Sequence, residues 1–431
     1  MKKALIPLVL LSFIISCSTE YSGIPEKYHS LLDTAFLKAG DNAEELSLAL
    51  SGSPRAQKEG MAFIISFMPE RDLISLKADF LLENAKYAYK ARNEFPWCAE
   101  LPDSIFLNEV LPYANTTEDR DPWREDYYNR FSKYVDTCDN IVDAIFAVNN
   151  NIMEEVGVEY NTKRSRVDAS PKQSMAEGMA TCTGLSIMLT DAFRSVGIPS
   201  RLAGTGMWTN MKGNHTWSEV WVDGDWMFTE YSPDTLNQSW FVADAGKADP
   251  ENPIHWIYAV SYKPTGMYYG AGTQAMHLIN EVDESQIPER WKSRLERMKE
   301  YGRNLPEPYV WGYNVTGRYI DIYRQQMENK QLADDECIAN VVVYRNENSV
   351  NSQGRISCLV EVYLNDEKID FGYSPSRLDD DNNFLKFRLK KNTPYKFIFY
   401  DEEQENEANE VIIETNEETE QEYKVVLGKE S

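Results

Sequence analysis

The apolar residues between positions 181 and 231 follow two different periods, one after the other. In the first half they recur every three or four residues, which is the spacing of one face of an α-helix. Gly197 and Pro199 follow directly and are typical of a helix end. The pattern therefore predicts a helix that begins next to Cys182 and stops before Gly197. Its apolar face comprises Leu185, Met188, Leu189, Ala192, Phe193 and Val196.

The second half of this segment alternates between polar and apolar residues, which predicts two strands. Residues 215–222 form the first run, and residues 226–231 form the second. Between them, Asp223-Gly224 is a strong signal for a tight turn. The segment therefore predicts a β-hairpin that follows the helix.

A turn centred on Asp223-Gly224 also fixes which side chains share a face of the hairpin. Val222 then lies opposite Asp225, and Trp217 lies opposite Glu230. Because cross-strand partners share a face, His215 joins Trp217 and Glu230 on one side, with Glu230 about 7–8 Å diagonally from His215. Trp217 is therefore expected in a substrate cleft together with Trp208, whereas the other tryptophans of this region are expected in the core.

The regions on either side of this segment have different patterns of apolar and polar residues. Residues 25–93 and 131–156 show helical spacing, interrupted by Gly and Pro. After Asp334 the chain changes to short alternating runs separated by Asn, Asp, Gly and Pro, which is typical of an all-β sandwich. Within that part, the acidic segments Asp379–Asp381 and Glu402–Glu410 are expected to be solvated loops. The fold class that this order predicts is α+β.

Three side chains of the central segment have the chemistry of a nucleophilic site. Cys182 is expected at a helix N-terminus, where free N–H groups and the helix dipole favour the reactive thiolate. His215 provides an imidazole that can serve as its base, and Glu230 provides a carboxylate that can hold that imidazole.

The residues Cys182 with GIPSR behind it, NHTWSEVW and DGDWMFTEY resemble the core of the transglutaminase-like superfamily. The resemblance covers residues 170–263 and implies a papain-like fold with a Cys-His-Asp triad. Carried over, Cys182 matches the nucleophile, His215 the base, and Glu230 the position of the usual aspartate. Glutamate keeps the charge but adds a methylene, so Asp234 stays open as the third member.

The resemblance and the change in the pattern of apolar and polar residues together predict the domain boundaries. Residues 1–17 are expected to be a signal and lipidation segment, and residues 18–160 a helical region. Residues 161–330 would hold the papain-like transglutaminase core with an extension, and residues 331–431 the β-sandwich.

The N-terminus has the pattern of an exported lipoprotein. Lys2 and Lys3 precede an apolar run from Ala4 to Ile15, and the run is too short to span a membrane as a helix. Its end, Ile14-Ile15-Ser16-Cys17, resembles a bacterial lipobox, in which the cysteine is acylated after cleavage. We therefore expect an exported protein that is anchored by a lipid on Cys17, at the periplasmic face or the cell surface.

Composition and charge narrow the class of protein. The chain has 431 residues, of which 42% are hydrophobic, and a net charge of −25, which argues against a nucleic-acid partner. Glycine-rich nucleotide loops and zinc-ligand spacings are missing, so no cofactor and no metal are expected. Apart from Cys17 and Cys182, four cysteines remain. Their proximity favours the pairs Cys98–Cys138 and Cys337–Cys358, while four free thiols are an equally open outcome.

Taken with the resemblance, the site predicts cysteine-dependent acyl transfer or hydrolysis on a peptide, protein or other amide substrate. A peptidase or amidase would use water as the acceptor, and a transglutaminase would use an amine. The alternative is an inactive core that binds a glycan or a protein at the cell surface, for which the Glu230 substitution is the one favourable feature.

Overall fold

The computed structural model describes residues 21–231, 235–270, 283–286, 289–303, 310–329, 332–350, 354–400 and 408–427. The expected lipidation site Cys17 and the alternative acid Asp234 lie outside these residues. In the described part of the chain, no helix combines the length and the apolar character that a membrane span requires.

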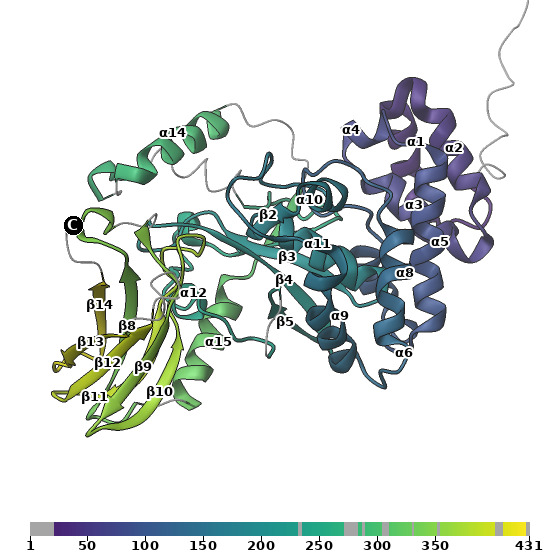
Figure 1. The fold of residues 1–431 in the computed structure, drawn as a ribbon. Helices are drawn as coiled ribbons and strands as arrows, with labels where there is room; N and C mark the ends of the chain where they lie inside the picture. The colour runs from purple at the N-terminus through teal and green to yellow at the C-terminus, as the bar shows by residue number, and fades with distance from the viewer. Residues whose placement is uncertain are drawn as a thin grey trace, which may run out of the picture.

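Helices form the N-terminal part of the described chain (Figure 1). Most of them are separated by the Gly and Pro residues that the sequence pattern uses as breaks. Up to residue 180 the helices are α1 (His29–Ala39), α2 (Ala43–Gly52), α3 (Lys58–Phe67), α4 (Glu70–Leu73), α5 (Ala78–Glu94), α6 (Pro96–Ala99), α7 (Asp103–Ile105), α8 (Arg124–Val135), α9 (Ile141–Val156) and α10 (Pro171–Glu177).

The helix predicted at Cys182 is confirmed as α11 (Cys182–Ser195). It lies between the N-terminal helices and a five-stranded sheet and contacts α5, α8 and α9 on one side and β3 and β4 on the other. One hydrophobic core extends from Ile24 in the helical region through α11 to Val222 in β4. The helical region and the nucleophile helix are therefore packed around the same apolar cluster.

The central sheet has the strand order β5-β4-β3-β6-β7, and all neighbouring strands are antiparallel. Its strands are β3 (Ser200–Thr205), β4 (His215–Val222), β5 (Asp225–Thr229), β6 (Tyr258–Ser261) and β7 (Trp311–Asn314). Apolar side chains of α12 (Val242–Ala245) and α15 (Thr316–Asn329) pack with Trp217 and Phe228 from the strands in a second core. Helix α14 (Glu289–Arg303) completes the described helices.

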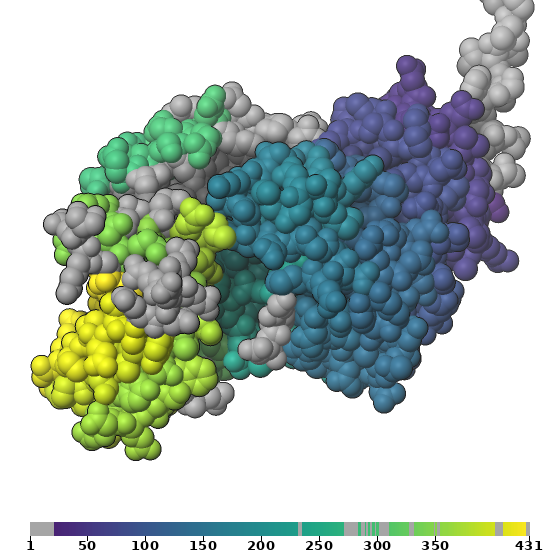
Figure 2. Space-filling model, viewed as in Figure 1, coloured from purple at the N-terminus to yellow at the C-terminus, as the bar shows by residue number. Residues whose placement is uncertain are grey.

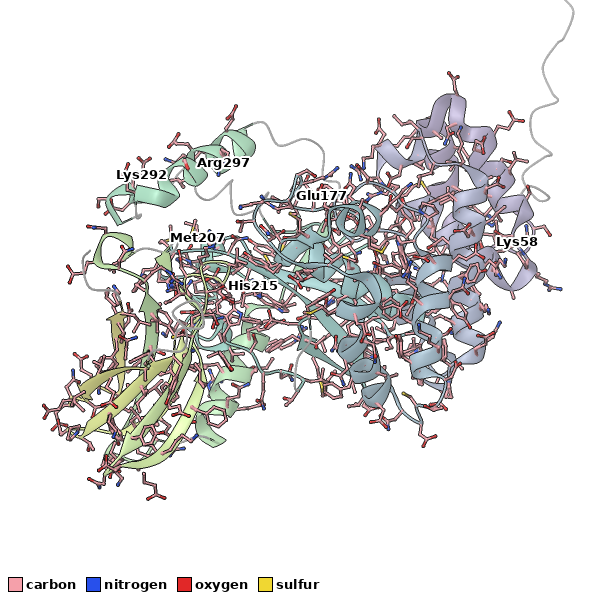
Figure 3. All side chains as sticks on the ribbon, in the orientation of Figure 1. Lys58, Glu177, Met207, His215, Lys292 and Arg297 are labelled. Carbon is pink, nitrogen blue, oxygen red and sulfur yellow. The ribbon has the colours of Figure 1, made fainter. Side chains whose placement is uncertain are left out.

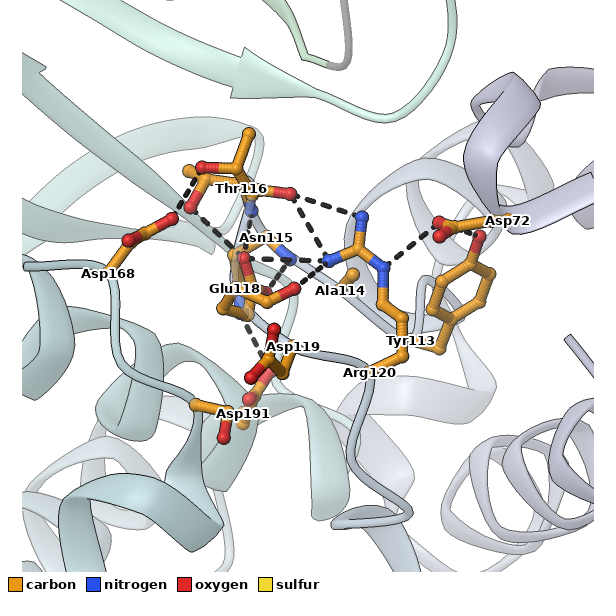
Figure 4. Close-up of polar contacts among 12 residues, drawn as sticks. Asp72, Tyr113, Ala114, Asn115, Thr116, Glu118, Asp119, Arg120, Asp168 and Asp191 are labelled. Carbon is orange, nitrogen blue, oxygen red and sulfur yellow. Dashed lines mark hydrogen bonds and ion pairs between the residues drawn. The ribbon is translucent and has the colours of Figure 1, made fainter. Parts of the chain in front are cut away.

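A buried polar network connects the loop before α8 to α11 (Figure 4). Glu118 accepts hydrogen bonds from the backbone N–H groups of Asn115 and Thr116 at 2.6 and 2.7 Å. The Asn115 amide in turn donates to Asp191 on α11 at 2.9 Å. Burial raises the pKa of the Asp191 carboxyl well above its usual range. Because buried polar groups are costly to separate from their partners, these bonds fix the loop on the nucleophile helix.

The C-terminal part consists of two sheets with the strand orders β10-β9-β12-β13 and β11-β8-β14. Both sheets contribute to one apolar core, as two packed layers require. The strands are β8 (Glu336–Tyr344), β9 (Leu359–Leu364), β10 (Glu367–Tyr373), β11 (Leu385–Lys390), β12 (Pro394–Tyr400), β13 (Ala408–Glu414) and β14 (Glu420–Val426). The alternating runs predict all of them except β10, whose apolar residues Ile369, Phe371 and Tyr373 are exposed.

The cysteine pairs favoured by sequence proximity are wrong. Cys98, Cys138, Cys337 and Cys358 are free thiols, as is Cys182. Cys98 packs inside the helical core and Cys138 against its edge, whereas Cys337 and Cys358 fill the core between the two C-terminal sheets. Their apolar surroundings give these thiols the role of small core side chains.

Candidate active site

Cys182 is the first residue of α11, directly after the short parallel pair of β1 (Glu159–Tyr160) and β2 (Met179–Ala180). The residue at the N-cap, Thr181, donates its hydroxyl to the carbonyl oxygen of Val167 at 2.9 Å and makes no side-chain cap bond to the helix. The first-turn N–H groups of α11 are therefore left to stabilise negative charge at Cys182.

Three hydroxyl groups on one side of α11 set its position along β4. Thr183 contacts the Thr216 hydroxyl at 3.1 Å, and Ser186 donates to the Thr216 carbonyl oxygen at 3.0 Å. One turn further, Thr190 contacts the Ser218 hydroxyl at 3.0 Å. Helical spacing brings these residues to the same face, so the helix start is held next to the start of β4.

The predicted hairpin is confirmed, with positive φ angles at Asp223 and Gly224 and with Val222 opposite Asp225. The β4–β5 ladder ends at the pair Ser218–Thr229, so Glu230 lies one residue beyond its last partner. From there the Glu230 carboxylate reaches back to His215, and its Oε1 lies 2.5 Å from His215 Nε2. The Ser239 hydroxyl donates to the other oxygen of the same carboxylate.

The His215 ring has a carboxylate on one side and the thiol on the other. Burial lowers the pKa of the imidazole, but the charge of Glu230 and the hydrogen bond with Cys182 outweigh it and raise the pKa to about 10. For Cys182, burial raises the pKa. The hydrogen bond and charge of His215, helped by the Thr216 N–H, reverse this and lower the pKa below its usual value. The arrangement favours a thiolate–imidazolium pair.

Two tyrosines complete the surroundings of the thiol. Burial raises the pKa of Tyr269, and the charge of Cys182 raises it further, while a hydrogen bond with Thr216 opposes the shift. The pKa of Tyr160 on β1 is also raised, by burial and then by the charge of Cys182. Both phenols therefore stay protonated and available as neutral donors near the nucleophile.

The expectation that Trp217 and Trp208 line a substrate cleft is wrong. Trp217 is 0% exposed and Trp208 is 2% exposed, and both belong to the core beneath His215. The Trp217 N–H donates to the Tyr319 hydroxyl at 2.5 Å, so its polar atom has a partner inside the protein. Sharing a strand face with His215 does not expose a side chain when α12 and α15 cover that face.

The indole that does lie beside His215 at the surface is Trp240. Its ring centre is 5.0 Å from that of the imidazole, and its side chain is half-buried. Trp240 and the neighbouring Ser239 belong to the LNQSWF segment. That segment follows the hairpin, but no periodicity assigns contacts to its residues. Only the structure brings them to His215 and Glu230.

The acidic segment Asp379–Asp381 is not a fully solvated loop as expected. Only Asp379 is exposed, whereas Asp380 and Asp381 are half-buried against the core region. The loop that carries them, residues 374–384 between β10 and β11, is called the acidic loop below. Asn210 of the core donates to Asn382 of this loop at 2.7 Å. Figure 3 shows His215 and Met207 on the side of the core that faces the C-terminal strands.

The polar groups of the site do not form a metal-ligand cluster. Across the ranges that the structure describes, no three His, Cys, Asp or Glu side chains are grouped closely enough to hold an ion. The arrangement provides the groups that nucleophilic catalysis requires, because a thiol, a base and a carboxylate lie in one row.

The chain is similar to known proteins over part of its length. Residues 129–231 match the model of the Transglutaminase-like superfamily, a range that includes Cys182, His215 and Glu230. A comparison with curated proteins finds no match. A solved structure from Cytophaga hutchinsonii, described as a "Putative Cysteine Protease", is similar at 16% identity with a TM-score of 0.26. The similarity covers 32% of this chain and 45% of that one, which is less than half of its length.

The chain thus contains a transglutaminase-like superfamily domain at residues 129–231. The match begins within α8 and ends with the residue after Glu230. It leaves out most of the N-terminal helices and all of the C-terminal strands.

Proposed function

We propose that this chain is a cysteine-dependent acyl-transfer enzyme that acts on peptide or other amide bonds. Cys182 is the nucleophile, His215 the general base and acid, and Glu230 the carboxylate that orients the imidazole. The observation that carries the proposal is the continuous row from the thiol through the imidazole to the carboxylate. The papain-like core, the helical N-terminal region and the C-terminal β-sandwich form part of the same proposal.

The chemistry follows from this row. The Cys182 thiolate attacks the amide carbonyl carbon, and the carbonyl π electrons move to oxygen. The Cys182 backbone N–H, free in the first helical turn, stabilises that oxyanion. The C–N bond then breaks, the amine leaves with a proton from His215, and a thioester on Cys182 remains. Water or an amine attacks the thioester, His215 takes the proton, and the C–S bond breaks to release the thiolate.

The acceptor decides between a hydrolase and a transamidase. Both use the same acyl-enzyme, so the distinction is made by the product. Mass analysis of the products with and without added methylamine measures it directly, because transfer to the amine adds the mass of the amine instead of that of water.

The first test of the proposal measures the reactivity of Cys182 against pH. Because the pKa of Cys182 is lowered, its alkylation by iodoacetamide is expected to be extensive well below the free-thiol pKa of about 8.5. Cys138 is a matched internal control, since it is also partly exposed but its pKa is raised by burial and by Asp143. Peptide mapping at pH 6.5 should find Cys182 modified and Cys138 intact. Equal modification of both thiols, appearing only near pH 8.5, would contradict a reactive thiolate.

We also propose that the protein is exported and anchored to a bacterial membrane by a lipid on Cys17. The lipobox-like sequence supports this proposal. Cys17→Ser is expected to move the protein to the soluble fraction or to leave the signal segment uncleaved, as measured by fractionation and N-terminal mass analysis. Cys138→Ser is the matched control and should stay with the membrane. Unchanged membrane association of Cys17→Ser would overturn the anchor.

A further inference from the structure

The acidic loop of the C-terminal part lies directly beside the candidate active site. In addition to the Asn210–Asn382 bond, Lys386 at the start of β11 donates to the Trp240 carbonyl oxygen at 3.4 Å. Figure 2 shows the yellow-green C-terminal residues against the core, with a recess between them and the blue helices. The acidic loop is therefore a neighbour of the candidate active site, and this neighbour lies outside the residues of the family match.

Within the loop, Asp380 approaches the backbone just before His215. Its Oδ2 lies 3.1 Å from the point where a β-carbon on Gly213 would stand. A side chain at position 213 would press against this carboxylate, so glycine permits the close approach. Gly213 is two residues before His215, which places the Asp380 carboxylate next to the catalytic row.

The loop is held in shape by a buried guanidinium. Arg355, which is 5% exposed, donates to the backbone carbonyl oxygens of Asp380, Asp381 and Asn383 at 2.7–3.1 Å. The N–H of Asn382 donates to Asp380 Oδ1 at 2.9 Å and orients the carboxylate. Because Arg355 fixes the backbone of the loop, the Asp380 side chain is already positioned in the folded protein. Ligand binding therefore loses little conformational entropy at this residue.

The charge of Asp380 is opposed by the His215 imidazolium and reinforced by the carboxylates of Asp381 and Asp244. Burial raises the pKa of this carboxyl to about 6, and the Asn382 N–H and the His215 charge oppose the shift. In return, its charge raises the pKa of the Cys182 thiol. The carboxylate and the nucleophile are thus close enough for their charges to interact.

A second polar group near Gly213 is the buried indole of Trp208. The indole N–H of Trp208 has no hydrogen-bond acceptor among the described residues, and the adjacent ring carbon Cδ1 lies 3.6 Å from the Gly213 β-carbon point. Buried donors without partners are rare in folded proteins. An unpaired donor and a half-buried carboxylate therefore flank the same glycine.

We propose that Asp380 is a specificity-determining residue that selects acyl substrates carrying a primary ammonium group close to the reacting carbonyl. This inference rests on the proposed acyl-transfer function and adds the substrate class. An ammonium group would pair with the carboxylate in a partly desolvated site, where such pairs are stronger than in water. The same pairing would remove the repulsion that Asp380 exerts on the Cys182 thiolate. Binding of a cationic substrate would therefore stabilise the thiolate that attacks it.

The first test uses thiol reagents that differ only in charge and needs no known substrate. In each of them the thiolate attacks the sulfenyl sulfur of a methanethiosulfonate, a disulfide to Cys182 forms, and methanesulfinate leaves. Relative to a free thiol in solution, the ethyltrimethylammonium reagent is expected to modify Cys182 faster than the ethylsulfonate reagent. Asp380→Asn should lower this ratio by about tenfold, and the preference should shrink with added salt.

Asp381→Asn is the matched control, because it removes one charge from the same loop. It should leave most of the ratio intact. An unchanged ratio in Asp380→Asn, or an equal drop in both variants, would overturn the proposal. Asp380→Glu keeps the charge and should retain the preference. A loss of the preference in Asp380→Glu together with a lowered melting temperature would indicate a folding defect. In that case Asp380→Ser separates the effect of the lost charge from the effect of the folding defect.

The second test distinguishes where the ammonium group lies on the substrate. Glycyl-7-amido-4-methylcoumarin is compared with its N-acetyl form, and N-acetyl-lysyl-7-amido-4-methylcoumarin with the N-acetyl-norleucyl compound. A preference in the first pair assigns an α-amino group, and one in the second pair a side-chain amine. Either preference should disappear in Asp380→Asn. If Cys182 turns these substrates over without any charge preference, the inference fails while the proposed function stands. If a reactive Cys182 is missing altogether, the function itself fails.

Discussion

Cys182→Ala is expected to lower the rate of acyl transfer by about 10⁶-fold, since removing the nucleophile of a catalytic unit costs about as much as removing the whole unit. The half-buried Cys182 side chain is small, so the fold should tolerate the change. The measurement is kcat on any amide substrate that the wild-type protein turns over. Cys138→Ala is the matched control and should keep full activity, because Cys138 packs at the edge of the helical core.

Two results would contradict this prediction in different ways. Substantial activity in Cys182→Ala would place the nucleophile elsewhere. A wild-type protein that neither turns over amides nor forms a thioester, although its thiol is reactive, would favour the alternative of a binding module built on a transglutaminase-like core.

Glu230→Gln is expected to lower kcat by about 10⁴-fold with the fold retained, because the amide keeps the shape but loses the charge that stabilises the imidazolium. The contact between Glu230 and His215 identifies the charge that this substitution removes from the imidazolium. Glu230→Asp should keep more activity than Glu230→Gln if β5 can adjust by one methylene. Ser239→Ala is a milder control, since it removes one bond to the carboxylate and leaves the charge.

The pH profile gives a second readout for the same residue. Productive protonation requires a deprotonated Cys182 and a protonated His215, so activity should rise through the lowered Cys182 pKa and fall near the His215 pKa of about 10. Because Glu230 raises the His215 pKa, Glu230→Gln should move the alkaline limb to lower pH. A fully active Glu230→Gln together with an inactive Asp234→Asn would assign the third member of the triad to Asp234.

Local patterns predict the parts of the site that neighbouring residues determine. The start of α11 at Cys182 and the turn at Asp223-Gly224 are both confirmed. Each depends on a period or a dipeptide within a few residues, so no distant part of the chain is needed to set it. The contact between His215 and Glu230 follows from the hairpin register, although the ladder ends one residue earlier than the register assumed.

Features that depend on distant segments could not be predicted. The burial of Trp217 comes from α12 and α15, about 25 and 100 residues further along the chain. The position of Asp380 beside Gly213 depends on how the C-terminal strands pack against the core, and a run of three aspartates alone favours a solvated loop. The free thiols show the same limit, because proximity in sequence does not fix the distance between two cysteines in the fold.

The shared core of the N-terminal helices and α11 has a consequence for any shortened version of this protein. A fragment limited to the family match at residues 129–231 would remove α5 and the start of α8, which contact α11, and would leave part of the apolar flank of α11 in water. It would also cut the Asn115–Asp191 bond and strand a buried carboxyl. The N-terminal helices that share this core therefore act as an intramolecular scaffold for the catalytic helix.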